Sequence, residues 1–102
     1  MPQDASRPID ATDRKLFDDV EAAAMYLEEI LADGDVELFK QALKDVAAAR
    51  VGSMTDLARA TKLAREALDR SLSREGNPRL DTLNKVLQAA GLRLSIAPDS
   101  AA

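Results

Sequence analysis

The chain of 102 residues contains no cysteine, no histidine and no tryptophan, and only three aromatic residues. Without Cys and His it has no disulfide, no thiol nucleophile, no imidazole base and none of the usual zinc ligands. No apolar run approaches the roughly 18 residues that a membrane-spanning helix needs. The N-terminal residues MPQDASRPID also lack the hydrophobic segment of a signal peptide. These absences predict a cytoplasmic protein with no metal, no cofactor and no enzymatic activity.

What the chain does have is 46% apolar residues, most of them Ala and Leu, and 31% charged residues. A core of small aliphatic side chains with few aromatics favours closely packed helices and disfavours a β-sandwich or barrel. The length is that of one domain with one modest core. We therefore expect a single all-α domain.

The charge is distributed unevenly along the chain, although its net value is only −4. Residues 1–50 hold twelve acidic and six basic side chains, whereas residues 51–102 hold six acidic and eight basic ones. Phosphate binding needs local positive potential, because screening limits distant charges to about 8–10 Å. The asymmetry suggests an acidic region for one partner and a basic face for another. The alternative is that these charges only solvate helix surfaces.

The N-terminal part predicts a flexible arm followed by two helices, over residues 17–50. Residues 1–16 have two prolines and no helical periodicity, so they either fold onto a partner or are a frayed terminus. Asp18 or Asp19 is expected to cap the first helix. Its apolar face is expected to contain Val20, Ala24, Leu27 and Leu31, flanked by Phe17, Ala23 and Ile30.

The second helix of this part is expected from Val36 to about Arg50. Gly34 can take the left-handed conformation that ends the first helix, and Asp35 can cap the second. An apolar stripe along the second helix leaves Lys40, Lys44 and Asp45 facing outward.

Residues 53–73 predict two short helices joined by a tight turn. Ser53 or Thr55 can cap the first helix, and Lys62, Leu63 and Ala64 form the turn. The small side chain of Ala58 lets the second helix cross closely, while Leu68 anchors that helix in the core. This layout is typical of a helix-turn-helix, whose second helix enters the DNA major groove.

The rest of the chain predicts a final helix over residues 79–91, a short strand over 92–97 and a tail over 99–102. Leu92, Leu94 and Ile96 alternate with polar residues, which is the period of a strand. A lone strand needs a partner, so we expect it to pair with the same strand of a second copy in a homodimer. The predicted fold is thus a five-helix, all-α helix-turn-helix domain over residues 17–98.

Two segments resemble a known family. The sequences LARATKLAREALDRSLS (residues 57–73) and GNPRLDTLNKVLQAAGLRLSIAP (residues 76–98) resemble HigA-type antitoxins. These are addiction-module antidote proteins with a repressor-like helix-turn-helix of the XRE class. The resemblance extends over roughly residues 17–98. It implies a DNA-binding repressor of its own operon that also binds and neutralises a small basic toxin of the RelE/HigB-like, mRNA-cleaving kind.

The chain departs from this family at three positions of the motif. Lys62 stands where the family usually has Gly, and Ala64 stands where it has Ser or Thr. A non-Gly residue in the left-handed conformation costs about 1 kcal/mol, and the loss of a hydroxyl cap costs about as much. Asp69 replaces an aromatic residue and discourages close approach of a phosphate.

The helix-turn-helix predicts which residues meet DNA. A guanidinium matches the O6 and N7 acceptors of guanine, which makes Arg65 the preferred base contact, and Glu66 can accept from cytosine N4. Both residues can equally be ordinary solvated side chains. The full set of expected base contacts is Ala64, Arg65, Glu66 and Asp69. The expected phosphate contacts are Thr55, Arg59, Lys62, Arg70, Arg74 and Asn77.

The toxin contact that the family implies is expected on the acidic N-terminal helix and the arm before it, because such toxins are basic. The expected residues are Phe17, Asp18, Asp19, Glu21, Glu28 and Glu29. The alternative is that this helix only completes the core. Another function also stays open, a protein-interaction module or plain XRE-type regulator without a toxin partner.

Overall fold

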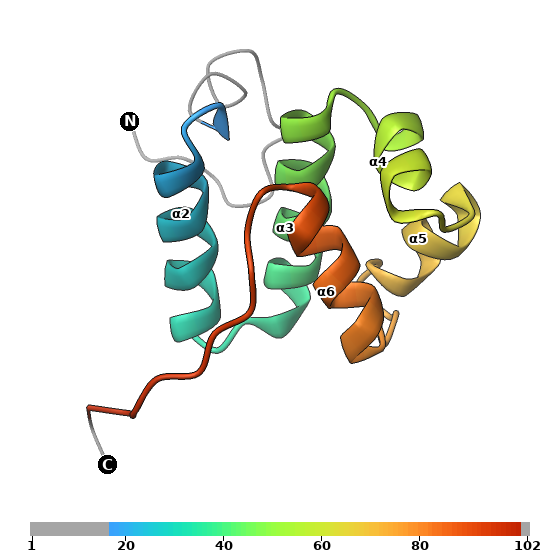
Figure 1. Cartoon of the computed structure of the whole chain (residues 1–102). Helices are drawn as coiled ribbons and strands as arrows, with labels where there is room; N and C mark the ends of the chain where they lie inside the picture. The colour runs from blue at the N-terminus through green and yellow to red at the C-terminus, as the bar shows by residue number, and fades with distance from the viewer. Residues whose placement is uncertain (1–16, 101–102) are drawn as a thin grey trace, which may run out of the picture.

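The computed structural model describes residues 17–100 and confirms that this part of the chain is all-helical. Its helices are α2 (Val20–Ala32), α3 (Val36–Val51), α4 (Met54–Thr61), α5 (Arg65–Ser71) and α6 (Leu80–Ala89) (Figure 1). No strand forms within residues 17–100, and residues 92–99 have no regular secondary structure. A strand that needs a second copy as partner cannot form in one chain, so the pairing of Leu92, Leu94 and Ile96 stays a prediction. The expected N-terminal arm lies outside the described residues.

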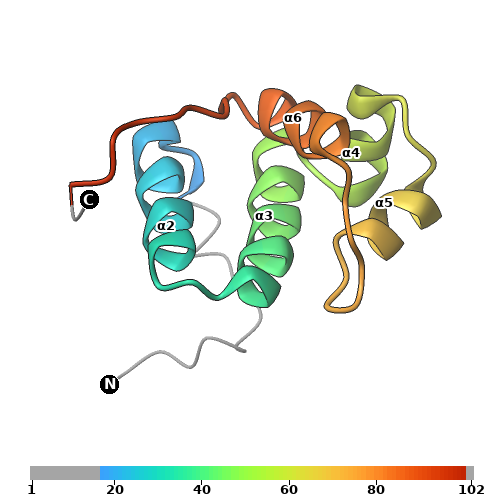
Figure 2. The ribbon, with the colours of Figure 1, turned by 90° about the horizontal axis from the view of Figure 1, so that it is seen from below.

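Helix α3 is the centre of the fold. Helix α2 packs along one side of it, while α4 and α6 pack against it on the other side and α5 packs on α4 (Figures 1 and 2). After α6 the chain turns back across the molecule and runs past α2 toward the C-terminus of the protein. None of the helices in the described part is long and apolar enough to cross a membrane.

The helix ends follow the local sequence. The side chains of Asp19, Asp35 and Ser53 accept hydrogen bonds from backbone N–H groups in the first turns of α2, α3 and α4, at 3.0, 3.0 and 3.1 Å. Each carboxylate or hydroxyl thereby satisfies a donor that has no partner within the helix. Gly34 has φ +81°, the left-handed conformation expected at the end of α2.

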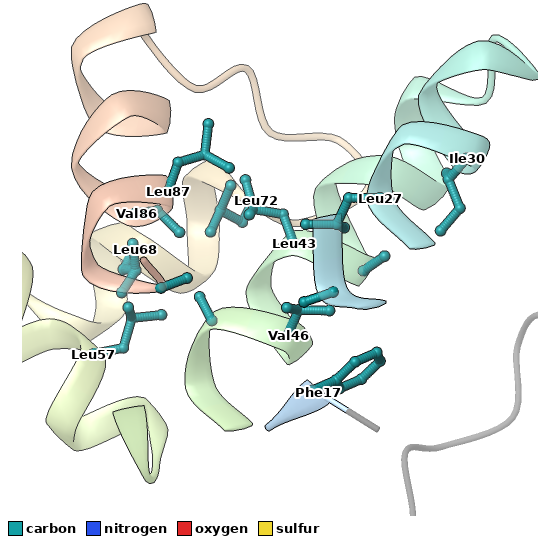
Figure 3. Packing of buried hydrophobic residues seen from close by; sticks show 14 residues of the cluster. Phe17, Leu27, Ile30, Leu43, Val46, Leu57, Leu68, Leu72, Val86 and Leu87 are labelled. Atoms are coloured by element: carbon teal, nitrogen blue, oxygen red, sulfur yellow. The ribbon is translucent and has the colours of Figure 1, made fainter. Parts of the chain in front are cut away.

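The core is one continuous cluster in which α3 contributes the central side chains (Figure 3). Leu43 and Val46 are fully buried between Leu27 of α2 and the leucines of the other helices. These leucines are Leu57 of α4, Leu68 of α5 and Leu72 just after α5, and all three are fully buried. The α4–α5 pair is therefore fixed to the rest of the domain by apolar burial.

The buried face of α2 differs from the predicted one. Val20 and Leu31 are 38% and 49% exposed, whereas Ala23 and Ile30 are buried together with Leu27. The helix is apolar over more than one face, so periodicity alone allowed several orientations. Packing against α3 selects the face that contains Ala23, Leu27 and Ile30.

The prediction that Lys40 faces outward is wrong, because this residue is only 6% exposed. Its Nζ donates hydrogen bonds to the carbonyl oxygens of Arg74 and Gly76, at 2.9 and 2.6 Å, and lies 3.7 Å from a carboxylate oxygen of Glu37. A Cβ at Gly76 would lie 2.2 Å from the Arg70 carbonyl oxygen, so only glycine allows the loop to approach α5 this closely. Lys40 thus holds the loop after α5 against α3.

Arg50 makes a similar long-range connection at the other end of α3. Its Nη1 donates to the carbonyl oxygens of Phe17 and Asp18, at 2.6 and 3.2 Å, and its Nε donates to the carbonyl oxygen of Ala90. One guanidinium therefore ties the chain before α2 to the end of α6.

Candidate functional site

Helix α4 ends in the tight turn that the sequence predicts at residues 62–64. Lys62 has φ 59° and ψ 31°, the left-handed conformation, and is the one non-glycine residue with positive φ within residues 17–100. The N–H groups of Lys62 and Leu63 donate to the carbonyl oxygens of Arg59 and Ala58, at 3.3 and 3.2 Å. This is the hydrogen-bond pattern of a Schellman motif, which normally has glycine at the left-handed position.

Helix α5 begins without a side-chain cap. Ala64 occupies the N-cap position in an extended conformation, and its methyl group accepts no hydrogen bond. The departure noted in the sequence at this residue therefore removes the cap and leaves the turn intact. Thr61, at the end of α4, is buried and donates its hydroxyl to the Leu57 carbonyl oxygen at 2.8 Å.

Helix α5 buries one face and exposes the other, as the motif requires. Leu68 and Leu72 have no exposed surface, whereas the side chains of Ala64, Arg65 and Glu66 are exposed at the start of the helix. The arrangement of α4, the turn and α5 thus fits a helix-turn-helix, in which these first residues of the second helix face a ligand.

Arg65 is held in place by two neighbours. Its Nη1 donates to the hydroxyl of Thr55 at 3.4 Å, and its Nε lies 4.0 Å from a carboxylate oxygen of Asp69. The other carboxylate oxygen of Asp69 lies 3.8 Å from Lys44 Nζ on α3. Exposed pairs of this kind contribute little to stability. Asp69 also connects α5 to α3, because its two carboxylate oxygens lie near Arg65 and Lys44.

The expected phosphate contacts are spread around this helix pair, and all are exposed. Thr55 and Arg59 lie on α4, and Arg59 Nη1 is 3.5 Å from an Asp56 carboxylate oxygen. Lys62 is in the turn and Arg70 is on α5. Arg74 and Asn77 lie in the loop that Lys40 holds.

The expected toxin contacts divide into two groups. Glu21, Glu28 and Glu29 are exposed on α2, and Asp18 is exposed just before it, while Asp19 is engaged as the helix cap. Phe17 is a correction, because it is only 2% exposed and packs on the ring of Tyr26 with 5.2 Å between ring centroids. Its side chain belongs to the core and is not on the surface.

The expected dimer residues are not equivalent in one chain. Leu92 is half-buried against the core, whereas Leu94 and Ile96 are 45% and 101% exposed. The apolar side chains that the chain leaves uncovered in this segment are therefore Leu94 and Ile96.

Sequence reasoning missed Lys40 and Arg50, both of which connect α3 to distant backbone carbonyls. No local pattern marks them, since their partners lie 32 to 40 residues away along the chain. Within residues 17–100 no three acidic, His or Cys side chains form a group able to hold a metal ion.

Comparison with known proteins shows the family of this chain and a relative. A family model described as "probable addiction module antidote protein" matches residues 7–98. A protein of Haemophilus influenzae described as uncharacterized is 40% identical over 76 residues, which cover 74% of this chain and 76% of that protein. No solved structure matches the chain.

Proposed function

We infer the function from the family to which this chain belongs, the probable addiction module antidote proteins. An antidote protein of an addiction module is an antitoxin, so the family implies a toxin as partner and is typically non-enzymatic. More finely, we propose a HigA-type antitoxin of the XRE class, acting in the cytoplasm. It represses its own operon through operator DNA and neutralises a RelE/HigB-like, mRNA-cleaving toxin by direct binding.

The observation that carries the DNA-binding part is the arrangement of α4 and α5. The exposed start of α5 enters the major groove, where Arg65 donates to guanine and Glu66 accepts from cytosine, with Ala64 and Asp69 beside them. The Thr55 hydroxyl and the Asp69 carboxylate both contact the Arg65 guanidinium and restrict its rotamers. Such pre-positioning reduces the side-chain entropy that Arg65 loses on binding.

The proposed phosphate contacts lie around α5, which we call the reading helix because its first residues contact the bases. They come from α4, the turn, α5 and the following loop, and comprise Thr55, Arg59, Lys62, Arg70, Arg74 and Asn77. A homodimer formed through Leu92, Leu94 and Ile96 carries two reading helices about one turn of DNA apart, roughly 34 Å. The operator is then an inverted repeat.

The toxin-binding part is supported by the acidic surface of α2. Glu21, Glu28 and Glu29 on α2, with Asp18 and Asp19 before it, present carboxylates on the side of α3 opposite the α4–α5 pair. A basic toxin complements this surface and leaves the DNA-reading helix free.

A gel shift with the DNA upstream of this gene tests the DNA-binding part. Arg65→Ala removes one bidentate base contact, so we expect about a tenfold loss of operator affinity with relaxed preference at one base pair. Lys85→Ala removes the same charge from an exposed position of α6 and serves as the matched control. Unchanged sequence preference in Arg65→Ala would contradict the assigned base contact.

The second candidate function is a protein-interaction module that does not bind DNA. It is favoured by the net charge of −4 and by the Asp69 carboxylate beside the proposed reading face. A confirmed dimer that gives no gel shift at low salt would rule out the repressor function and leave the second candidate.

A further inference from the structure

Helix α2 has a second apolar surface besides the face that it buries in the core. Met25 and Leu31 are 62% and 49% exposed, although both are large apolar side chains. The spacing i, i+3, i+4 and i+7 places four residues on the face of α2 away from the core, namely Met25, Glu28, Glu29 and Ala32.

This surface is hollowed, because the C-terminal segment returns to α2 and forms one wall. Figures 1 and 2 both show that segment running past the helix. The hollow has a volume of about 780 Å³. We call it the α2 groove; its lining consists of Met25, Glu28, Glu29, Leu31 and Ala32 of α2 and of Ala97 and Asp99 of the C-terminal segment.

The groove carries negative charge that the described part of the chain does not neutralise. Glu28 and Glu29 form no ion pair within residues 17–100, and the last turn of α2 contains no basic residue. Both carboxylates are on the C-terminal half of the helix, where the helix dipole is also negative. Apolar side chains surrounded by uncompensated carboxylates fit a segment that is apolar at its centre and basic at its edges.

We propose that the α2 groove receives a segment of the toxin in which an apolar side chain is flanked by Lys or Arg. The apolar side chain packs on Met25 and Leu31, and the cations meet Glu28 and Glu29. This proposal rests on the proposed function, since it names where the toxin docks. It adds the C-terminal segment at Ala97 as part of the docking surface.

A second copy of this chain is the less suitable occupant. A two-fold interface would place the same patch on both sides, so Glu28 and Glu29 of one copy would face those of the other. Like charges facing each other across an interface are unfavourable, whereas a basic partner is attracted.

The test measures the affinity of the full chain for the purified protein encoded by the reading frame beside this gene, by isothermal titration calorimetry. Met25→Glu should weaken binding about tenfold or more, because it puts a charge where an apolar side chain is buried. Glu28→Lys combined with Glu29→Lys should weaken binding at least as much, and added salt should lower the affinity less than it does for the wild type. Val36→Glu is the matched control, because Val36 is 55% exposed at the start of α3, and it should change affinity less than about twofold.

The outcomes separate this proposal from the one it rests on. If the wild-type chain does not bind that protein, the proposed toxin partnership fails and the groove assignment with it. If the wild type binds and the groove variants bind equally well, the groove assignment alone is wrong. A Met25→Glu chain that loses its dimeric state or its thermal stability would show that the groove is already covered by a second copy or by the chain itself. Loss of the dimeric state and loss of thermal stability would each overturn the proposal.

Discussion

Replacing the buried Lys40 by methionine tests how the loop after α5 is held. Methionine keeps the apolar stem of the side chain and removes the ammonium group that donates to the Arg74 and Gly76 carbonyl oxygens, at 2.9 and 2.6 Å. Each hydrogen bond to a charged donor contributes about 1.5–3 kcal/mol. The variant recovers the cost of burying the ammonium, and water can reach the freed carbonyls of a surface loop. We therefore expect a net loss of about 2 kcal/mol in the free energy of unfolding.

Thermal and urea unfolding followed by circular dichroism measure this loss. For a domain of this size, a loss of about 2 kcal/mol corresponds to a fall of about 10 °C in Tm. Lys85→Met removes a lysine from an exposed position and should change the free energy of unfolding by less than about 0.5 kcal/mol. If Lys40→Met is no less stable than Lys85→Met, the two carbonyl contacts do not hold the loop and the reasoning is refuted.

Two further variants test backbone strain and electrostatics. Lys62→Gly should raise the free energy of unfolding by about 0.5–1 kcal/mol in a urea titration, because φ is 59° and glycine adopts this conformation without strain; an unchanged midpoint would contradict strain at the turn. Asp45 is exposed as a residue, but partial desolvation of its carboxylate on α3 raises its pKa, an effect that nearby Lys44 only partly opposes. Since a raised folded-state pKa makes the ionised form destabilising, Asp45→Asn should be more stable than the wild type at pH 7. This advantage should shrink as the pH falls through the folded-state pKa toward the ordinary value of 3.8, and a difference that does not vary with pH would refute the assignment.

The helix ends could be predicted from the sequence because capping is a local interaction. Asp19, Asp35 and Ser53 each bond to a backbone group two or three residues away, so the residue type and its neighbours suffice. The turn at Lys62 follows for the same reason, since its two hydrogen bonds stay within five residues. The exposed face of α5 could also be predicted, because Leu68 and Leu72 are the large apolar residues of that segment.

The candidate site was predicted less completely than the helices. The exposure of Arg65 and Glu66 follows from the position of Leu68, and the pair of Arg65 with Asp69 is an i, i+4 contact within α5. The contact of Arg65 with Thr55 requires the crossing of α4 and α5. The sequence predicts Phe17 both beside the apolar face of the first helix and among the toxin contacts, and it does not decide between these two roles. The burial of Phe17 depends on Tyr26, with which its ring packs, and on Arg50, which binds its carbonyl oxygen.

The sequence by itself determined an all-helical chain, the capping residues of α2, α3 and α4, and the tight turn between α4 and α5. These depend on propensity, capping and spacing, which act over a few residues. Only the tertiary structure decided which face of α2 is buried, that Lys40 and Arg50 bind distant carbonyls, and that the C-terminal segment makes a groove beside Met25. The physical reason is that an Ala-rich and Leu-rich helix has several faces of similar hydrophobicity, and a long basic side chain serves equally at the surface or inside. Packing on α3 removes that ambiguity.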